Sequence, residues 1–302
     1  MKTCKLLSIA LLFSALLVCR FASANDSSFG DSNGTIKFKA EPDISMDKEV
    51  LTISQKKVLV EYVFTNTSQK ELTIPIAFPM PPMYFGQGDH SEIADFKLMV
   101  NGKQVKTERK LVVLLDNGQD ITQNFFELGW DVNAVASLEE GEYPNNKKQL
   151  PARWLDKNNS PRFTISEYFI WKQTFPAGKP VAISHSYKPS ISSGVPRPAS
   201  EIIQTFKKST CLNENAQSTI RKQSGVHGVN WEHLSYILMT AKNWQGPIKD
   251  FRLIIKKQNA SDLLSLCFDE ELVKTDSKTY QFHKQNFIPK RNLELLFISK
   301  TE

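Results

Sequence analysis

Apolar and polar residues alternate with a period of two in one stretch of the N-terminal part of the chain. Between residues 58 and 78, apolar side chains occupy every second position: first Val58, Val60, Tyr62 and Phe64 and, after a polar break, Leu72, Ile74, Ile76 and Phe78. Successive side chains of a strand point to opposite faces, so this pattern predicts two half-buried β-strands. Each apolar face needs a second layer to cover it, which favours a β-sandwich or two facing sheets.

Shorter segments of the same kind predict strands along most of the chain. They lie at about 36–38, 50–54, 96–100, 111–115, 163–175, 181–187, 231–241, 250–256, 263–268, 279–283 and 292–298. Between residues 100 and 103, Asn101-Gly102 predicts the tight turn of a hairpin. Capping and turn residues predict short helices at about 120–129, 131–141, 200–208 and 213–222, with a helical turn near 152–155.

These elements together indicate a mostly β protein of the α+β class. We expect a β-sandwich-like N-terminal domain over residues 25–190, with a short helical insertion at about 120–156. We expect a smaller mixed α/β C-terminal domain over residues 191–302. The boundary between them is placed at a cluster of turn-forming residues, Pro189, Gly194, Pro196 and Pro198.

Residues 1–24 have the pattern of a cleavable signal peptide. Lys2 and Lys5 precede a fourteen-residue apolar run, and Ala22-Ser23-Ala24 supplies small residues for cleavage. The run is short for a membrane span, and no later run approaches that length, so the mature chain is expected to lack a transmembrane segment. A lipid-modified Cys19 is the disfavoured alternative, because Val18 precedes it. The protein is therefore expected to be exported, either to the periplasm or, by a second step such as type II secretion, to the medium.

Cleavage of the leader changes the charge and the cysteine content. Three of the 38 basic residues leave, so 35 face 32 acidic residues and the net charge falls from +6 to +3. No dense basic block with interleaved aromatic residues remains, which argues against a nucleic-acid partner. Two cysteines remain, Cys211 and Cys267, and in an oxidising compartment they most simply form one disulfide. Two unpaired buried cysteines are the alternative.

Three residues are weak candidates for catalysis. His227 and His233 flank Glu232, but their H-x5-H spacing does not match known zinc-binding pairs, so neither a metal nor another cofactor is expected. On a strand, Glu232 and His233 would point to opposite faces. His185 shares a strand face with Ile183 and Tyr187, which favours a buried histidine over a catalytic one.

The other candidates are large apolar side chains that could bind a ligand. Met83, Tyr84 and Phe85 follow a proline-rich segment and could form a contact surface on a loop, although packing over the end of a sheet is the alternative. Among the tryptophans, Trp154 lies on the connector and is expected to be the exposed one. The others are expected to pack in β cores, where aromatic residues dominate burial.

The chain resembles the bacterial secreted family described as domain of unknown function 4424. The matching segments are Met46–Phe64 with Ala77-Phe78-Pro79, Trp171–Gly178 through His185, Tyr187 and Pro189, and Asn243–Ile248 followed by Phe251-Arg252-Leu253. The two cysteines also fall where that family places its own. The segment Asn33-Gly34-Thr35 departs from the glycine-rich opening of the family. The resemblance implies an exported, mostly β protein and supplies no mechanism.

The sequence therefore favours a non-enzymatic exported protein that binds a partner protein, a glycan or an envelope component through its loops and the interdomain cleft. A hydrolase of unrecognised type, acting on envelope or extracellular material, is the alternative. A structural or assembly subunit is the third hypothesis.

Overall fold

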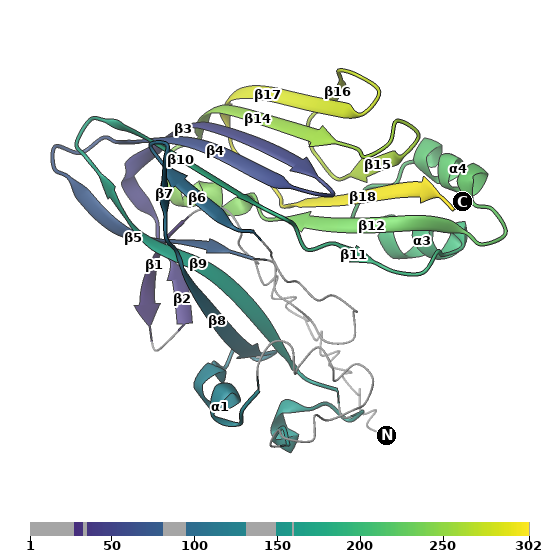
Figure 1. Ribbon diagram of the computed structural model, residues 1–302, viewed down its shortest axis with the longest axis horizontal. Coiled ribbons are helices and arrows are strands. Elements are labelled where there is room, and N and C mark those ends of the chain that lie inside the picture. Colours follow the sequence, from purple (N-terminus) through teal and green to yellow (C-terminus); the bar gives the residue numbers. More distant parts are fainter. Residues whose placement is uncertain (1–26, 33–34, 81–94, 131–148, 159, 302) are drawn as a thin grey trace, which may run out of the picture.

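The computed structural model describes residues 27–32, 35–80, 95–130, 149–158 and 160–301. Three β-sheets with short helices between them make up this part of the chain (Figure 1). The mostly β fold that the periodicity predicts is therefore confirmed. No helix within these described ranges is long and apolar enough to cross a membrane.

The largest sheet has nine strands. Across the sheet they run in the order β16 (Val273–Lys274), β17 (Thr279–Phe287), β14 (Ile248–Lys256), β3 (Glu41–Ser54), β4 (Val58–Asn66), β10 (Pro180–Tyr187), β6 (Lys97–Val100) and β7 (Lys103–Val105), with β13 (Trp244–Gln245) beside β3. Strand β3 is antiparallel to β4 and parallel to β14. The sheet therefore combines strands from both sides of residue 190, and the proposed division into two domains at that point stays a prediction.

The second sheet has five strands and faces the first. Its order is β2 (Thr35–Phe38), β1 (Ser27–Ser32), β5 (Leu72–Pro79), β9 (Phe163–Phe175) and β8 (Glu108–Leu115). The two strands predicted at 58–78 are thus β4 and β5, and they belong to different sheets. Phe64 of β4 and Phe175 of β9 meet edge to face, with ring centroids 6.1 Å apart. Their apolar faces share one large core, which is the arrangement of facing layers that the alternation favours.

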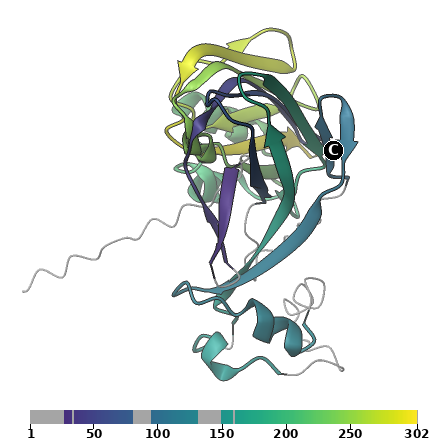
Figure 2. The same ribbon diagram turned by 90° about the vertical axis from the view of Figure 1, so that its left-hand side faces the viewer.

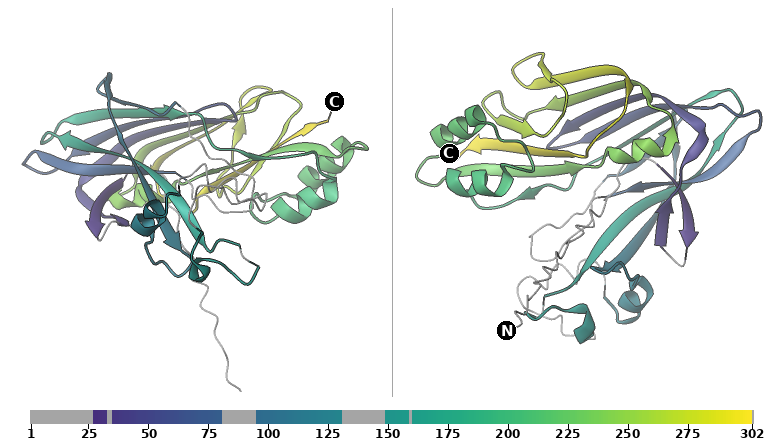
Figure 3. Two further views of the ribbon diagram at one scale, coloured as in Figure 1. Left: turned by 60° about the horizontal axis from the view of Figure 1, so that its bottom comes forward. Right: turned by 180° about the vertical axis from the view of Figure 1, so that it is seen from behind.

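The third sheet has four strands and carries two helices. Its order is β11 (Ser192–Ser193), β12 (Val229–Tyr236), β18 (Leu293–Lys300) and β15 (Leu263–Leu266). Helices α3 (Ala199–Phe206) and α4 (Glu214–Gln223) lie beside this sheet (Figure 3). Ile202 and Phe206 of α3 and Ile220 of α4 pack with Trp231 and Ile298 of the strands. Asn213 caps α4 by accepting a hydrogen bond from the Ala216 N–H group.

The predicted helical insertion forms a small unit with its own core. The lower ends of β8 and β9, helix α1 (Thr122–Glu127) and the 3-10 turn η2 (Ala152–Trp154) project away from the other sheets (Figures 1 and 2). Buried residues there include Phe125, Trp130 and Phe163. The second predicted helix, 131–141, and the leader, 1–24, lie outside the described residues.

Several predicted strands differ in length from the observed ones: the strand predicted at 279–283 runs to Phe287, and the strand predicted at 111–115 begins at Glu108. The strand predicted at 50–54 begins at Glu41, because a register shift between Met46 and Lys48 accommodates residues that break the simple alternation. The strand predicted at 231–241 ends at Tyr236. The side chain of Asn292 accepts hydrogen bonds from the Leu238 and Met239 N–H groups, and a 3-10 turn, η3 (Met239–Asn243), follows.

Candidate functional site

A polar cleft of about 310 Å³ lies between the nine-stranded and the four-stranded sheet. One wall comes from strands β11, β12 and β18, and the other from the β3–β4 turn and the segment that follows β14. Amide side chains dominate the polar lining: Gln55, Asn230, Gln258 and Asn259. Two carboxylates, those of Glu232 and Asp262, complete the polar groups that could orient a ligand, and Trp231 borders the cleft.

Gln55 connects the two walls of the cleft. It is 8% exposed, and it occupies the turn directly after β3. Its side-chain N–H donates to the Glu232 carboxylate at 2.7 Å, and its side-chain oxygen accepts from the Gln258 backbone N–H at 3.1 Å. Both polar ends of one amide are thereby used, which fixes the orientation of the carboxylate that faces the cleft.

Strand alternation decides which residues of β12 enter the cleft. Trp231 packs against Phe206 of α3, with ring centroids 5.5 Å apart, and its indole N–H donates to the Val195 carbonyl. Glu232 points to the other face, where it meets Gln55. His233 returns to the helix side, with its ring centroid 5.2 Å from that of Phe206. Glu232 and His233 therefore lie on opposite faces of the strand, as predicted, and form no joint site.

A buried lysine holds the segment that forms the second wall. Lys257 is 6% exposed, and its amine donates to the carbonyls of Ala260 at 2.9 Å and Asp262 at 2.6 Å. Burial lowers the pKa of this amine and the nearby charge of Lys274 lowers it further, whereas Asp262 opposes the shift. The Asp262 carboxylate accepts from the Asn259 N–H at 2.8 Å. The second wall of the cleft is therefore a turn whose carbonyl groups are held by the ammonium group of Lys257.

Replacing this lysine by methionine is expected to lower the free energy of unfolding by about 2 kcal/mol, because two carbonyls lose a charged donor. The exposed neighbour Lys256 is the matched control, and Lys256→Met is expected to change stability by less than about 0.5 kcal/mol. Urea denaturation measures both values, and amide exchange should accelerate at 258–262 in Lys257→Met alone. Equal stability of the two variants would contradict this role for the amine.

His233 belongs to a polar contact outside the cleft. Its Nε2 atom lies 3.1 Å from the Glu294 carboxylate, and the Ser235 hydroxyl donates to the same carboxylate at 2.5 Å. The hydroxyl thus donates to the acid and not to the imidazole, which is not the arrangement that activates a serine nucleophile. Within the described residues, no group of three His, Cys, Asp or Glu side chains could hold a metal ion.

His185 lies on the core face of β10, as its alternation with Ile183 and Tyr187 predicts, and is 1% exposed. Its ring lies among aromatic rings, with centroids 4.3 Å from Phe78 and 5.5 Å from Tyr62. It does not line the cleft. A catalytic role for His185, Glu232 or His233 stays a prediction that no contact described above supports.

The predicted exposure of Trp154 is wrong. The residue is 1% exposed, because the short helical unit needs its own core and the indole supplies much of it. Its ring meets Phe163 edge to face at 6.2 Å, and its carbonyl accepts from the Arg162 N–H, which ties the connector to β9. The other predicted contact residues, Met83, Tyr84 and Phe85, lie outside the described residues.

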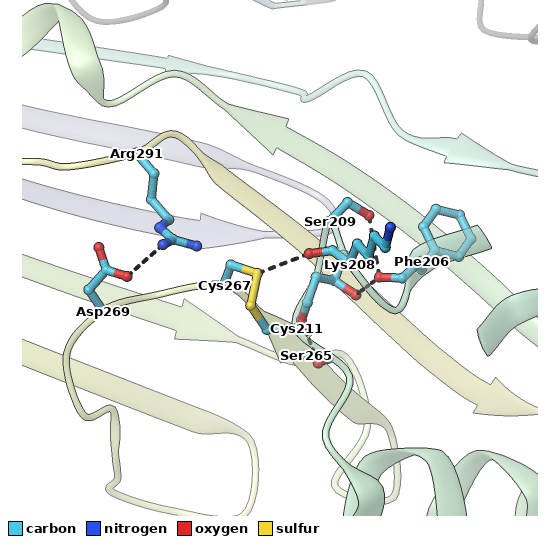
Figure 4. Close-up of a disulfide and its surroundings, with 9 residues drawn as sticks. Phe206, Lys208, Ser209, Cys211, Ser265, Cys267, Asp269 and Arg291 are labelled. Atoms are coloured by element: carbon cyan, nitrogen blue, oxygen red, sulfur yellow. Dashed lines mark hydrogen bonds and ion pairs between the residues drawn. A yellow bond between two sulfur atoms is a disulfide. The ribbon is translucent and has the colours of Figure 1, made fainter. Parts of the chain in front are cut away.

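The predicted disulfide between Cys211 and Cys267 is confirmed. It joins the α3–α4 connection to the residue that follows β15 (Figure 4), with the Cα atoms 4.9 Å apart. The Ser265 hydroxyl donates to the Thr210 carbonyl beside it, and Asp269 pairs with Arg291 at 2.8 Å. The bond fixes the helical layer to the four-stranded sheet.

A family model described as domain of unknown function (DUF4424) matches residues 24–296. No curated protein matches the chain in sequence. Among solved structures, a candidate nutrient-binding protein from Legionella pneumophila is 17% identical at a TM-score of 0.46, covering 91% of this chain and 70% of that one. Yeast LTA4 hydrolase in complex with bestatin is 9% identical at a TM-score of 0.34, covering 84% and 28%. An M1 zinc metallopeptidase variant from Deinococcus radiodurans is 8% identical at a TM-score of 0.28, covering 86% and 43%. These distant likenesses supply no function for the cleft.

Proposed function

Because the chain belongs to the family described as domain of unknown function 4424, whose name assigns no activity, we propose a function from the cleft itself. The protein is an exported, non-enzymatic binding protein that holds a small, hydroxyl-rich ligand, a saccharide unit, between the nine-stranded and the four-stranded sheet. The disulfide is compatible with export, because such bonds persist in oxidising compartments.

The composition of the cleft supports this ligand class. A sugar hydroxyl both donates and accepts hydrogen bonds, and an amide side chain offers a donor and an acceptor in one plane. The amides of Asn230, Gln258 and Asn259, two carboxylates, and the hydroxyls of Ser193 and Ser299 therefore match a ligand with many hydroxyls, while the Gln55 amide holds Glu232 in place.

The single observation that carries the proposal is the fixed Glu232 carboxylate. Gln55 orients it from the opposite wall at 2.7 Å, so the acceptor is already in place before a ligand enters. A pre-oriented acceptor reduces the entropy lost on binding. The alternative of a hydrolase rests on the presence of two carboxylates, Glu232 and Asp262, in one cleft, as in glycosidases. Asp262, however, is 5% exposed and serves the turn at Asn259, which favours binding over proton transfer.

The test is isothermal titration calorimetry of the full mature protein against neutral oligosaccharides. Glu232→Gln keeps the shape of the side chain and removes its charge, so we expect binding to weaken about tenfold. Glu61→Gln is the matched control, because Glu61 is exposed on the outer face of β4, and it should bind as the wild type does. Absence of saccharide binding, or equal binding by Glu232→Gln, would overturn the proposal. Release of a shortened sugar would support the hydrolase instead.

A further inference from the structure

One end of the nine-stranded sheet carries a concentration of lysines. We define the lysine row as the lysines at this end of strands β16, β17, β14, β3, β4 and β10: Lys274, Lys278, Lys256, Lys257, Lys56, Lys57 and Lys188. All of them are exposed except Lys257. They come from four separate segments of the sequence, at 56–57, 188, 256–257 and 274–278, so they do not form one basic block in the sequence.

Strand register places these lysines side by side. Lys256 of β14 lies opposite Ser54, the last residue of β3, and opposite Thr279, the first residue of β17. Tyr187, the last residue of β10, lies opposite Val58, the first residue of β4. Lys274 of β16 lies opposite Tyr280 of β17. Five strand spacings therefore separate the two ends of the lysine row, or about 24 Å.

The positive charges of the row act on one another and on Asp276, an acidic residue beside them. The charge of Lys274 contributes to the lowered pKa of Lys257, after burial. Asp276, in the turn between β16 and β17, has a lowered pKa because it accepts hydrogen bonds from the backbone of Lys278 and from Thr279, and because Lys256 is near. A negatively charged ligand lying along the row would relieve this repulsion.

The lysine row continues directly into the cleft. Gln55, which connects the two walls, is followed by Lys56 and Lys57 in the same turn. Lys257 anchors the second wall, and the amine of Lys278 donates to the carbonyl of Gln258 at 2.8 Å. A linear ligand with one of its units bound in the cleft would thus extend out of the cleft across the lysine row.

From this continuity we propose that the ligand is an acidic oligosaccharide, in which one sugar occupies the cleft and the carboxylates of the following sugars pair with the lysine row. The inference rests on the proposed function and names its ligand class. The carboxylates belong outside the cleft, because Glu232 and Asp262 would repel them inside it.

The same observations favour a glycan over other polyanions. Lysines are point charges that pair with any anionic group, whereas single-stranded nucleic acid binding adds aromatic platforms for the bases. In the part of the chain that the structure describes, the ring that meets a lysine of the row is that of Tyr280, which is half-buried and lies under the buried amine of Lys257, 5.8 Å away. Tyr187, beside Lys188, is buried in the core. A narrow row along strand ends fits a linear chain better than it fits the plane of a membrane.

The experiment compares a hexamer of galacturonate with the same hexamer as its neutral methyl ester, using the full mature protein in calorimetry. The variant Lys56→Gln/Lys256→Gln/Lys274→Gln removes three exposed charges of the row. The matched control, Lys70→Gln/Lys103→Gln/Lys179→Gln, removes three exposed lysines elsewhere on the sheets and their loops. Salt is raised from 0.1 M to 1 M, which shortens the Debye length from about 10 Å to about 3 Å.

We expect the acidic hexamer to bind the row variant about tenfold more weakly than it binds the control, and to lose affinity in salt. The neutral hexamer should bind all three proteins equally. Equal binding of both hexamers, unaffected by the row variant, would overturn this inference and leave the proposed function in place. Binding of neither hexamer would overturn both. Lysine-dependent binding to anionic phosphatidylglycerol vesicles or to oligo(dT), without any preference for the acidic hexamer, would also overturn it.

Discussion

Replacing Gly228 by alanine is expected to lower the free energy of unfolding by about 4 kcal/mol, a combination of backbone strain and steric overlap. Gly228 lies in the turn before β12 with a φ of +85°. A Cβ atom there would stand 2.2 Å from the carbonyl oxygen of Arg197 and 2.9 Å from the nitrogen of Pro198. Both are backbone atoms, so no side chain can rotate away.

The carbonyl that would be displaced already has a structural role. It accepts a hydrogen bond from the Val229 N–H, while the Arg197 N–H donates to the Val229 carbonyl. This pair joins the segment before α3 to the start of β12, and Trp231, two residues further on, lines the cleft. A shift of Arg197 would therefore disturb the cleft as well as the stability.

Two other glycines allow the cost of backbone strain to be measured without the steric overlap of an added Cβ atom. Gly102 and Gly178 also have positive φ values, +76° and +64°, but a Cβ atom there would meet nothing within 4 Å. Alanine at either position should lower the free energy of unfolding by only about 1 kcal/mol. Urea denaturation followed by circular dichroism compares the three variants. If Gly228→Ala is no less stable than Gly102→Ala, the close approach of the Arg197 backbone does not contribute to the loss of stability, which would contradict the prediction.

Removing the disulfide should have an effect of similar size. Cys211 and Cys267 are 56 positions apart, and releasing a loop of this length restores chain entropy to the unfolded state that is equivalent to about 4 kcal/mol. Since each kcal/mol shifts the Tm of a chain of this size by about 3 °C, Cys211→Ser/Cys267→Ser should melt about 12 °C lower. The helical layer over β12 and β18 should show the largest increase in amide exchange.

Reductant provides the control for this second prediction. A reducing agent should lower the Tm of the wild-type protein to that of Cys211→Ser/Cys267→Ser and leave the Tm of the variant unchanged. Equal melting of wild-type and variant proteins under oxidising conditions would show that the bond adds nothing to stability.

Local pattern was enough to predict most strands and helices. The period-two alternation at Val58–Phe64 depends only on which side chains face a core, and β4 follows it. The helices α3 and α4 could be placed to within about two residues, because Asn213 and the nearby prolines mark their starts. Trp154 was misjudged because a connector with many polar residues gives no sign that it encloses a separate core.

The cleft could not be predicted in the same way. Gln55 follows a strand and precedes two lysines, which is the ordinary composition of a surface turn. Its importance comes from Glu232, a residue 177 positions away, and from the segment after β14. Lys257 is likewise unremarkable in sequence, and only tertiary structure buries its amine. The sequence suggested a cleft between two domains, but it could not show which side chains line the cleft. Those donors and acceptors come together only through contacts between residues far apart in the chain.

The parallel pairing of β3 with β14 also constrains when the protein can fold. Glu49 lies opposite Phe251, 202 positions later in the chain. Until residues 248–256 have emerged, β3 has a long unpaired edge in the middle of the future sheet. Contacts of this separation slow folding, because loop closure precedes any gain from pairing. Folding is therefore completed only late in synthesis, and the exposed edge is the segment that a holding chaperone would have to cover.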